Sequence, residues 1–146
     1  MKWSIQQLQK LTVKPYQFEC VLDFTELAKD VSDIIEIKPV HVNGVISYLK
    51  EGTFRINYTV DVLIIMECGL TLEPVDYHFN HEYDEVYSVY ATEDEFLIEK
   101  NTIDMDEAVW SNIIIDKPIV VTRDDAYEIL KARGIVLNES EDDLID

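Results

Sequence analysis

The chain has 146 residues, with 30 acidic and 12 basic side chains, and its net charge at neutral pH is -18. This length fits a single domain, and a hydrophobic content of 47% is enough to bury a core without disulfides or a structural metal. The excess of acid repels phosphate at long range, which excludes a general nucleic-acid binder and makes DNA an unfavourable partner.

Two further features bear on where the protein works. The longest nearly uninterrupted apolar run, Val60 to Met66, contains Asp61 and is far shorter than the ~20 residues of a membrane-spanning helix. The N-terminus has neither the apolar core nor the cleavage site of a signal peptide. We therefore expect a cytoplasmic protein with no membrane partner.

The first half of the chain predicts long strands. Apolar and polar side chains alternate over residues 16–24 and again over 40–48, which places each apolar set on one face of a sheet. Gly44 interrupts the second series, where a bulge or bend would be tolerated. A turn at residues 50–53 leads into a third alternating series over 54–66. These segments predict a long hairpin.

A third long strand is predicted after Pro74. Residues 75–83 alternate between an aromatic face and a very polar face. Tyr77, Phe79 and Tyr83 are of the kind that stack on bases in RNA-binding sheets, but core packing is the favoured interpretation because the opposite face is acidic. Together the strands predict an α+β fold in which long antiparallel strands form a curved or barrel-like sheet.

Toward the C-terminus the spacing of apolar residues changes from the two-residue period of strands to the spacing of helices. Two helices are predicted there, packed on the sheet. Asp104 precedes apolar residues spaced four apart, and Glu107 stands at the partner position of a capping box. Pro118 ends this helix. Trp110 widens its apolar face and is expected to be packed on the sheet.

The second predicted helix is shorter. Thr122 and Asp125 have the spacing of a capping box, and Gly134 closes the apolar stripe that follows. Residues 138–146 carry five acids and no base, which predicts a disordered tail. We therefore expect one domain over residues 1–137 followed by this tail.

Charge is distributed unevenly along the chain. Residues 73–116 contain thirteen acids and a single base, Lys100, whereas residues 1–18 contain three lysines and no acid. The acidic segment predicts a surface for a basic protein partner, and the lysines predict limited contact with RNA phosphate. The predicted protein-partner residues are Glu82, Asp84, Glu85, Glu93, Asp94 and Glu95, and the predicted phosphate contacts are Lys2, Lys10 and Lys14.

Patterns for catalysis or metal binding are weak. The sequence has no glycine-rich phosphate loop, nucleophile elbow or helical His-Glu zinc motif, so we expect neither an enzyme nor a cofactor. The best candidate for a zinc site is Cys68 with His78 and His81, because thiolate and imidazole are zinc ligands. Strand alternation speaks against it, since it predicts that the two histidines face opposite sides of the sheet. Cys20 lies in the apolar register of its strand and is expected to be a buried small hydrophobe.

The segment from Met66 to Val75 reads MECGLTLEPV. It resembles the C-x-x-C-L-x-P-hydrophobic motif of the YceD family, the large ribosomal RNA subunit accumulation proteins. Residues 1–8 and 37–44 upstream, and 102–105 and 117–119 downstream, look like the Gram-positive branch of that family. The motif residues in this chain are Cys68, Leu70, Thr71, Leu72 and Pro74, with Thr71 where most members have the second cysteine.

The resemblance implies a non-enzymatic ribosome-biogenesis factor that supports accumulation of large-subunit (23S) ribosomal RNA. Many members end in a cysteine-rich segment, whereas residues 121–146 contain no cysteine, so a metal role does not carry over. The charge favours binding of a basic ribosomal protein or a pre-50S particle over direct binding of RNA. A small-molecule-binding acidic β-barrel carrier is the main alternative, and a degenerate zinc enzyme, which bound metal would reveal, is the third.

Overall fold

The computed structural model describes residues 1–11, 14–90, 92–122 and 125–134 as an α+β fold, so the predicted fold class is confirmed. The predicted tail, residues 138–146, lies outside the described residues. The elements in chain order are β1 Lys2–Ser4, α1 Ile5–Leu8, the 3-10 helix η1 Gln9–Leu11, β2 Tyr16–Leu22, α2 Thr25–Ala28, β3 Ile34–Ile37, β4 Val40–Lys50, β5 Thr53–Glu67, β6 Pro74–Ser88, β7 Phe96–Leu97, β8 Thr102–Asp104, α3 Met105–Asp116 and α4 Ala126–Ala132.

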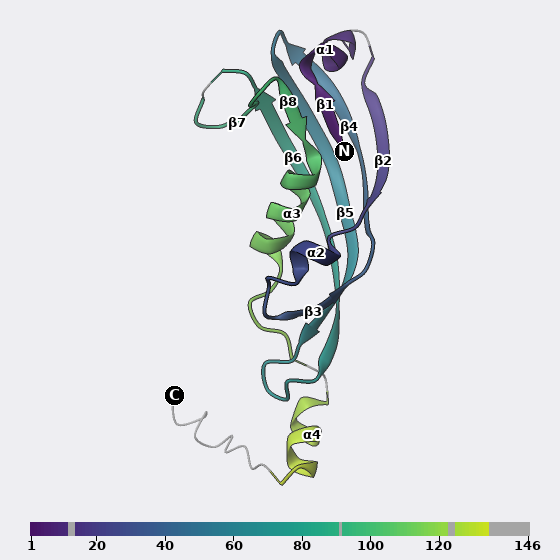
Figure 1. Cartoon of the computed structure of the whole chain (residues 1–146), viewed down its shortest axis with the longest axis vertical. Helices are drawn as coiled ribbons and strands as arrows, with labels where there is room; N and C mark the ends of the chain where they lie inside the picture. Colours follow the sequence, from purple (N-terminus) through teal and green to yellow (C-terminus); the bar gives the residue numbers. More distant parts are fainter. Residues whose placement is uncertain (12–13, 91, 123–124, 135–146) are drawn as a thin grey trace.

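The long strands form one twisted sheet in the order β2-β4-β5-β6-β7, and β3 pairs with β5 beyond the end of β4 (Figure 1). β4 and β5 form the predicted hairpin, with Gly52 at a φ of 74° in its turn, a conformation that glycine adopts without strain. β6 pairs antiparallel with β5 over the full length of both strands, as predicted. The sheet is open and does not close on itself.

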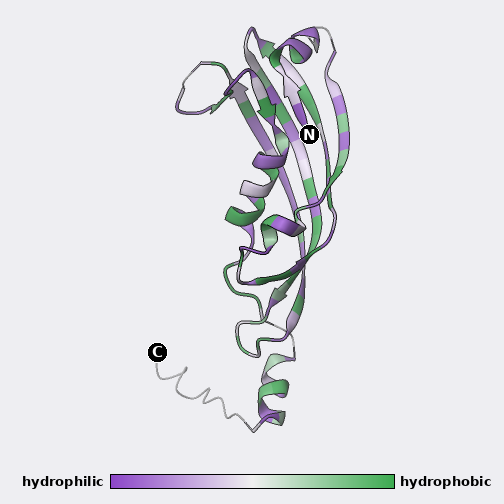
Figure 2. Cartoon of the chain, viewed as in Figure 1, coloured by the Kyte–Doolittle hydropathy of each residue, from purple (hydrophilic) through white to green (hydrophobic). Residues whose placement is uncertain are grey.

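Alternation along the strands builds the core. Every second residue of β5, from Phe54 to Met66, is at most 2% exposed, while the residues between them face the other side. The same alternation is visible in Figure 2 as bands of hydrophobic and hydrophilic colour along the strands. Phe79 is fully buried on this inner face, and Tyr77 and Tyr83 pack against it, so core packing is confirmed for the aromatic stripe. Cys20 is partly buried against the same core, and burial raises the pKa of its thiol above the ordinary value.

Gly44 serves a close approach between strands rather than a bulge. The register of β4 against β5 runs unbroken through Gly44, and the shift lies between Tyr48 and Lys50. A Cβ at Gly44 would lie 2.4 Å from the carbonyl oxygen of Asn57 and 2.6 Å from the Cβ of Tyr58. The glycine therefore lets the backbones of the two strands come closer than any side chain would allow.

α3 covers the inner face of the sheet. Asp104 is its N-cap, as predicted, and accepts hydrogen bonds from the backbone N–H groups of the first turn. The helix ends just before Lys117 and Pro118, also as predicted. Trp110 is only partly buried, and it packs on Phe24 at a ring separation of 5.2 Å, so it contacts the segment entering α2 as well as the core.

α4 lies at the far end of the sheet, beside the turn between β5 and β6 (Figure 1). Arg133 ties it there by donating to the carbonyl oxygen of Thr71, 3.1 Å away. The predicted N-cap, Thr122, is wrong: the helix begins at Ala126 with Asp125 at the N-cap position. Gly134 follows the helix with a φ of 79°, as expected for a closing glycine.

The N-terminus has two short features that the strand and helix patterns did not predict. Ser4 and Gln7 form a reciprocal capping box that begins α1, which the Ser-x-x-Gln spacing could have revealed. β1 pairs antiparallel with β8 and places Lys2 opposite Asp104. None of the helices in the described ranges has the length and apolar character needed to cross a membrane.

Candidate functional site

The exposed acids of β6 lie on the face of the sheet turned away from α3, which we call the open face. Glu82 and Asp84 are both exposed there, because residues two apart on a strand share a face. Asp84 pairs with Arg55 of β5 at 3.1 Å. This part of the predicted protein-partner surface is therefore accessible to a large partner.

Glu85 does not belong to that surface, and its prediction as a partner contact is wrong. It is 8% exposed and points to the inner face, because adjacent residues of a strand point to opposite faces and its neighbour Asp84 lies on the open face. Its Oε1 accepts hydrogen bonds from the hydroxyls of Tyr58 and Tyr87, each 2.8 Å away. Its Oε2 accepts from Asn112 of α3 at 3.0 Å. Buried carboxylates require such donors, and three side chains from three elements supply them.

The Glu85 cluster, made of Glu85, Tyr58, Tyr87 and Asn112, joins α3 to the sheet. Asn112 also donates to the Tyr58 hydroxyl at 2.7 Å, which closes the network. Burial raises the pKa of Tyr58 and of Tyr87 well above the ordinary value, and the charge of Glu85 adds to both shifts. The tyrosines therefore stay protonated as donors, and the cluster is a structural element of the interface between α3 and the sheet.

The remaining predicted acids lie in the loop between β6 and β7. Glu93 and Asp94 are exposed, and Glu95 accepts a hydrogen bond from the Thr92 hydroxyl at 2.6 Å. Apolar side chains flank them: Tyr90 and the two residues of β7 are each about half exposed. The predicted acidic surface is thus two patches, one on the open face of β6 and one on this loop.

One of the three predicted phosphate contacts, Lys2, lies beside an acid. Lys2 is 3.7 Å from Asp104, because β1 pairs with β8. The N-terminal ammonium group pairs with Asp106 in the first turn of α3. Lys10 in η1 and Lys14 before β2 are exposed. The folding of acidic α3 against the N-terminus weakens the positive field that the sequence suggested.

The motif residues form a tight turn between β5 and β6. The Sγ of fully buried Cys68 accepts from the backbone N–H groups of Leu70 and Thr71, each at 3.4 Å. Thr71 is buried, and its hydroxyl accepts from the backbone of Glu73. Leu72 has a φ of 62°, and both Leu70 and Leu72 project into solvent. Pro74 is exposed at the start of β6.

The proposed zinc ligands are not brought together. His78 lies on the open face, where its Nε2 is 2.5 Å from Asp61. His81 lies on the inner face against Phe79, at a ring separation of 4.3 Å, so the expected opposition of the two histidines is confirmed. Hydrogen bonds from Asn80 and His78 hold the pKa of Asp61 below its ordinary value. Across the described part of the chain, no three potential ligands gather into a metal-binding group.

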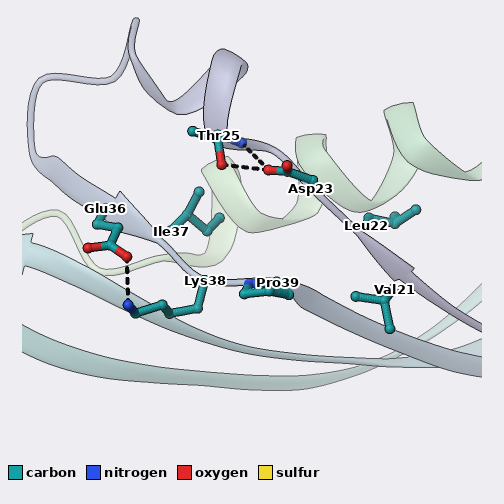
Figure 3. Close-up of a pocket in the computed structure, with 8 residues that line it drawn as sticks. All are labelled: Val21, Leu22, Asp23, Thr25, Glu36, Ile37, Lys38 and Pro39. Carbon is teal, nitrogen blue, oxygen red and sulfur yellow. Dashed lines mark hydrogen bonds and ion pairs between the residues drawn. The ribbon is translucent and has the colours of Figure 1, made fainter.

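A pocket of about 430 Å³ opens where β2, α2 and β3 meet. Figure 3 shows that its polar side chains already have partners within the pocket wall. Asp23 accepts from the backbone and hydroxyl of Thr25, and Glu36 pairs with Lys38 at 2.6 Å. Its volume falls in the range of small-molecule sites, but none of the predicted site residues lines it.

The chain is similar to an uncharacterized protein, YlbN, of Bacillus subtilis (strain 168), with 29% identity over 126 residues. The similarity covers 83% of this chain and 73% of that protein. No family model matches the chain. No solved structure matches it either.

Proposed function

We propose that this protein is a non-enzymatic, cytoplasmic ribosome-biogenesis factor that binds a basic ribosomal protein or a pre-50S particle and so supports accumulation of 23S ribosomal RNA. The observation that carries the proposal is the acidity of residues 73–116 together with the exposure of Glu82, Asp84 and the acids of the β6–β7 loop. A surface of this charge raises the association rate of a basic protein and repels RNA phosphate.

The positions of Lys2 and of the N-terminal ammonium group support a protein partner over RNA. Lys2 is beside Asp104, and the N-terminal ammonium group pairs with Asp106. An RNA strand approaching this end of the molecule would meet the acids of α3 as well as the lysines. A basic protein approaching the open face of β6 would meet exposed Glu82 and Asp84, with the nearby Arg55 already paired to Asp84.

The test is a pull-down at low salt with the purified chain, followed by identification of the bound proteins and RNA. We expect a basic large-subunit ribosomal protein to be captured, with capture fading at 1 M salt, where the Debye length falls to about 3 Å. Replacing Glu82 and Asp84 by Lys should slow capture, while Glu85 is left unchanged to preserve the fold. Capture of RNA alone, strengthened by these replacements and lost when Lys2, Lys10 and Lys14 become Glu, would refute the proposal.

A small-molecule carrier is the second candidate, and the pocket beside β2 is the observation that favours it. A ligand bound there would raise the melting temperature by mass action. Stabilisation of the protein by a metabolite extract, lost on replacement of Ile37 by a bulkier side chain, would support the carrier. No change in melting temperature would count against it.

A further inference from the structure

One edge of the main sheet is open over most of its length. β6 pairs with β5 from Pro74 to Ser88 on one side, but on the other side it pairs only with β7, at Tyr87 and Ser88. Within the described residues, no hydrogen bond reaches the backbone of residues 75–84 from that second side. Alternate residues of this ten-residue stretch therefore present their backbone N–H and C=O groups outward, which is the template for adding another strand.

The side chains along this edge select what can be added. Asp76, Glu82 and Asp84 are exposed on the open face, and among the ion pairs of the described residues only Asp84 takes part, with Arg55. A strand added to β6 places its own side chains directly opposite these acids on the same face. Lys or Arg at those positions would gain charge pairs, whereas acidic residues would be repelled.

The same acids disfavour a second copy of this chain as the occupant. Antiparallel pairing of two β6 edges centred on Asn80 would set Asp76 opposite Asp84, and like charges directly opposite are destabilising. Charged residues on an edge strand protect a protein from pairing with itself. They leave the edge available to a strand of opposite charge.

We propose that residues 75–84 of β6 bind an extended, basic segment of a partner protein as an added β-strand. The inference rests on the proposed function, since it names the site and the binding mode for the basic partner. Backbone hydrogen bonds along β6 supply affinity, and Asp76 and Glu82, six residues apart on one face, select Lys or Arg at matching alternate positions.

A synthetic peptide of about ten residues with alternating Lys and Val tests the binding mode directly. We expect it to bind the full chain and to protect alternate backbone amides of residues 75–84 from hydrogen exchange. A second peptide, N-methylated at alternate amides, keeps the charge but cannot complete the strand ladder, and it should not bind measurably. Equal binding of both peptides, or protection confined to α3 or the β6–β7 loop, would overturn the added-strand mode.

Matched variants separate the edge from general acidity. The double variant Asp76→Asn, Glu82→Gln should bind the peptide about tenfold more weakly, because each lost surface charge pair weakens binding about threefold. The control Glu19→Gln, Asp30→Asn removes the same charge from exposed positions on β2 and just after α2, outside the predicted partner surface, and should bind as the unaltered protein does. Equal weakening by both pairs would reduce the effect to net charge and overturn the proposal.

A final arm distinguishes this inference from the function on which it rests. The unaltered protein and both double variants are tested for capture of purified large-subunit ribosomal proteins, identified by mass spectrometry. Loss of capture by the edge variant alone supports the added strand. Capture that survives in the edge variant refutes the edge as the site while leaving the proposed function standing. If the unaltered protein binds the peptide but captures no ribosomal protein, the proposed function fails and the edge takes basic strands of another origin.

Discussion

Replacing Glu85 by Ala should destabilise the fold strongly, although the sequence places this residue in an acidic run next to solvent-facing Asp84. The change removes the acceptor of the Tyr58 and Tyr87 hydroxyls and one acceptor of Asn112. A buried donor left without a partner costs roughly 1–3 kcal/mol, so two hydroxyls give about 2–6 kcal/mol in all. This is a large part of the roughly 5–15 kcal/mol that stabilises a domain.

The measurement is the melting temperature of the two proteins by calorimetry, supported by urea unfolding. For a domain of this size, about 2–6 kcal/mol corresponds to a fall of roughly 6–20 °C in the melting temperature. Glu85→Gln keeps an acceptor oxygen for both tyrosines and should cost only about 1 kcal/mol. Glu82→Ala, an exposed change on the same strand, should stay within about 0.5 kcal/mol. The reasoning is refuted if Glu85→Ala proves as mild as Glu82→Ala, or if the Gln variant is as unstable as the Ala variant.

Further perturbations test other parts of the fold. Above about pH 10 the unfolded chain loses tyrosine protons that buried Tyr58 and Tyr87 retain in the folded protein. The free energy of unfolding should therefore fall by about 1.4 kcal/mol per pH unit for each of the two tyrosines. A free energy of unfolding that stays constant with pH, measured with urea, would contradict their raised pKa values. Gly44→Ala should destabilise the fold by about 1–3 kcal/mol or more, because the new Cβ meets the backbone of β5. In Gly134→Ala the new Cβ meets no atom, and the positive φ alone should cost about 1 kcal/mol. Similar melting temperatures of the two variants would argue against the close approach of β4 and β5. Trp110→Ala should lower the free energy of unfolding by less than the roughly 3–5 kcal/mol expected for a fully buried tryptophan, because Trp110 is only partly buried. An unchanged free energy of unfolding would argue against the packing of Trp110 on Phe24. Elemental analysis of protein purified without added metal should find no stoichiometric zinc, since no three potential ligands gather in the described ranges.

The sequence alone determined the strands of the sheet and the start of its main helix. Alternation over residues 54–66 and 75–83 predicted β5 and β6 and their inner faces, because a strand has a period of two and one face must be buried. Asp104 marked the start of α3, because an N-cap is a local hydrogen bond between neighbours in the chain. Such features depend only on residues that are close in the sequence, so the sequence is enough to predict them.

The tertiary structure decided which acids can meet a partner. Glu85 is buried because Tyr58 of β5 and Asn112 of α3 join Tyr87 of its own strand in donating to it, and the sequence pattern near Glu85 does not show the two donors that lie 27 residues away. Lys2 lies beside Asp104 for a similar reason, since the pairing of β1 with β8 closes a separation of about a hundred residues. The free edge of β6 is likewise a property of strand order. Hydrogen bonds between distant segments and the order of strands in a sheet are set by the packing of the whole chain, and so they emerge only once it is folded.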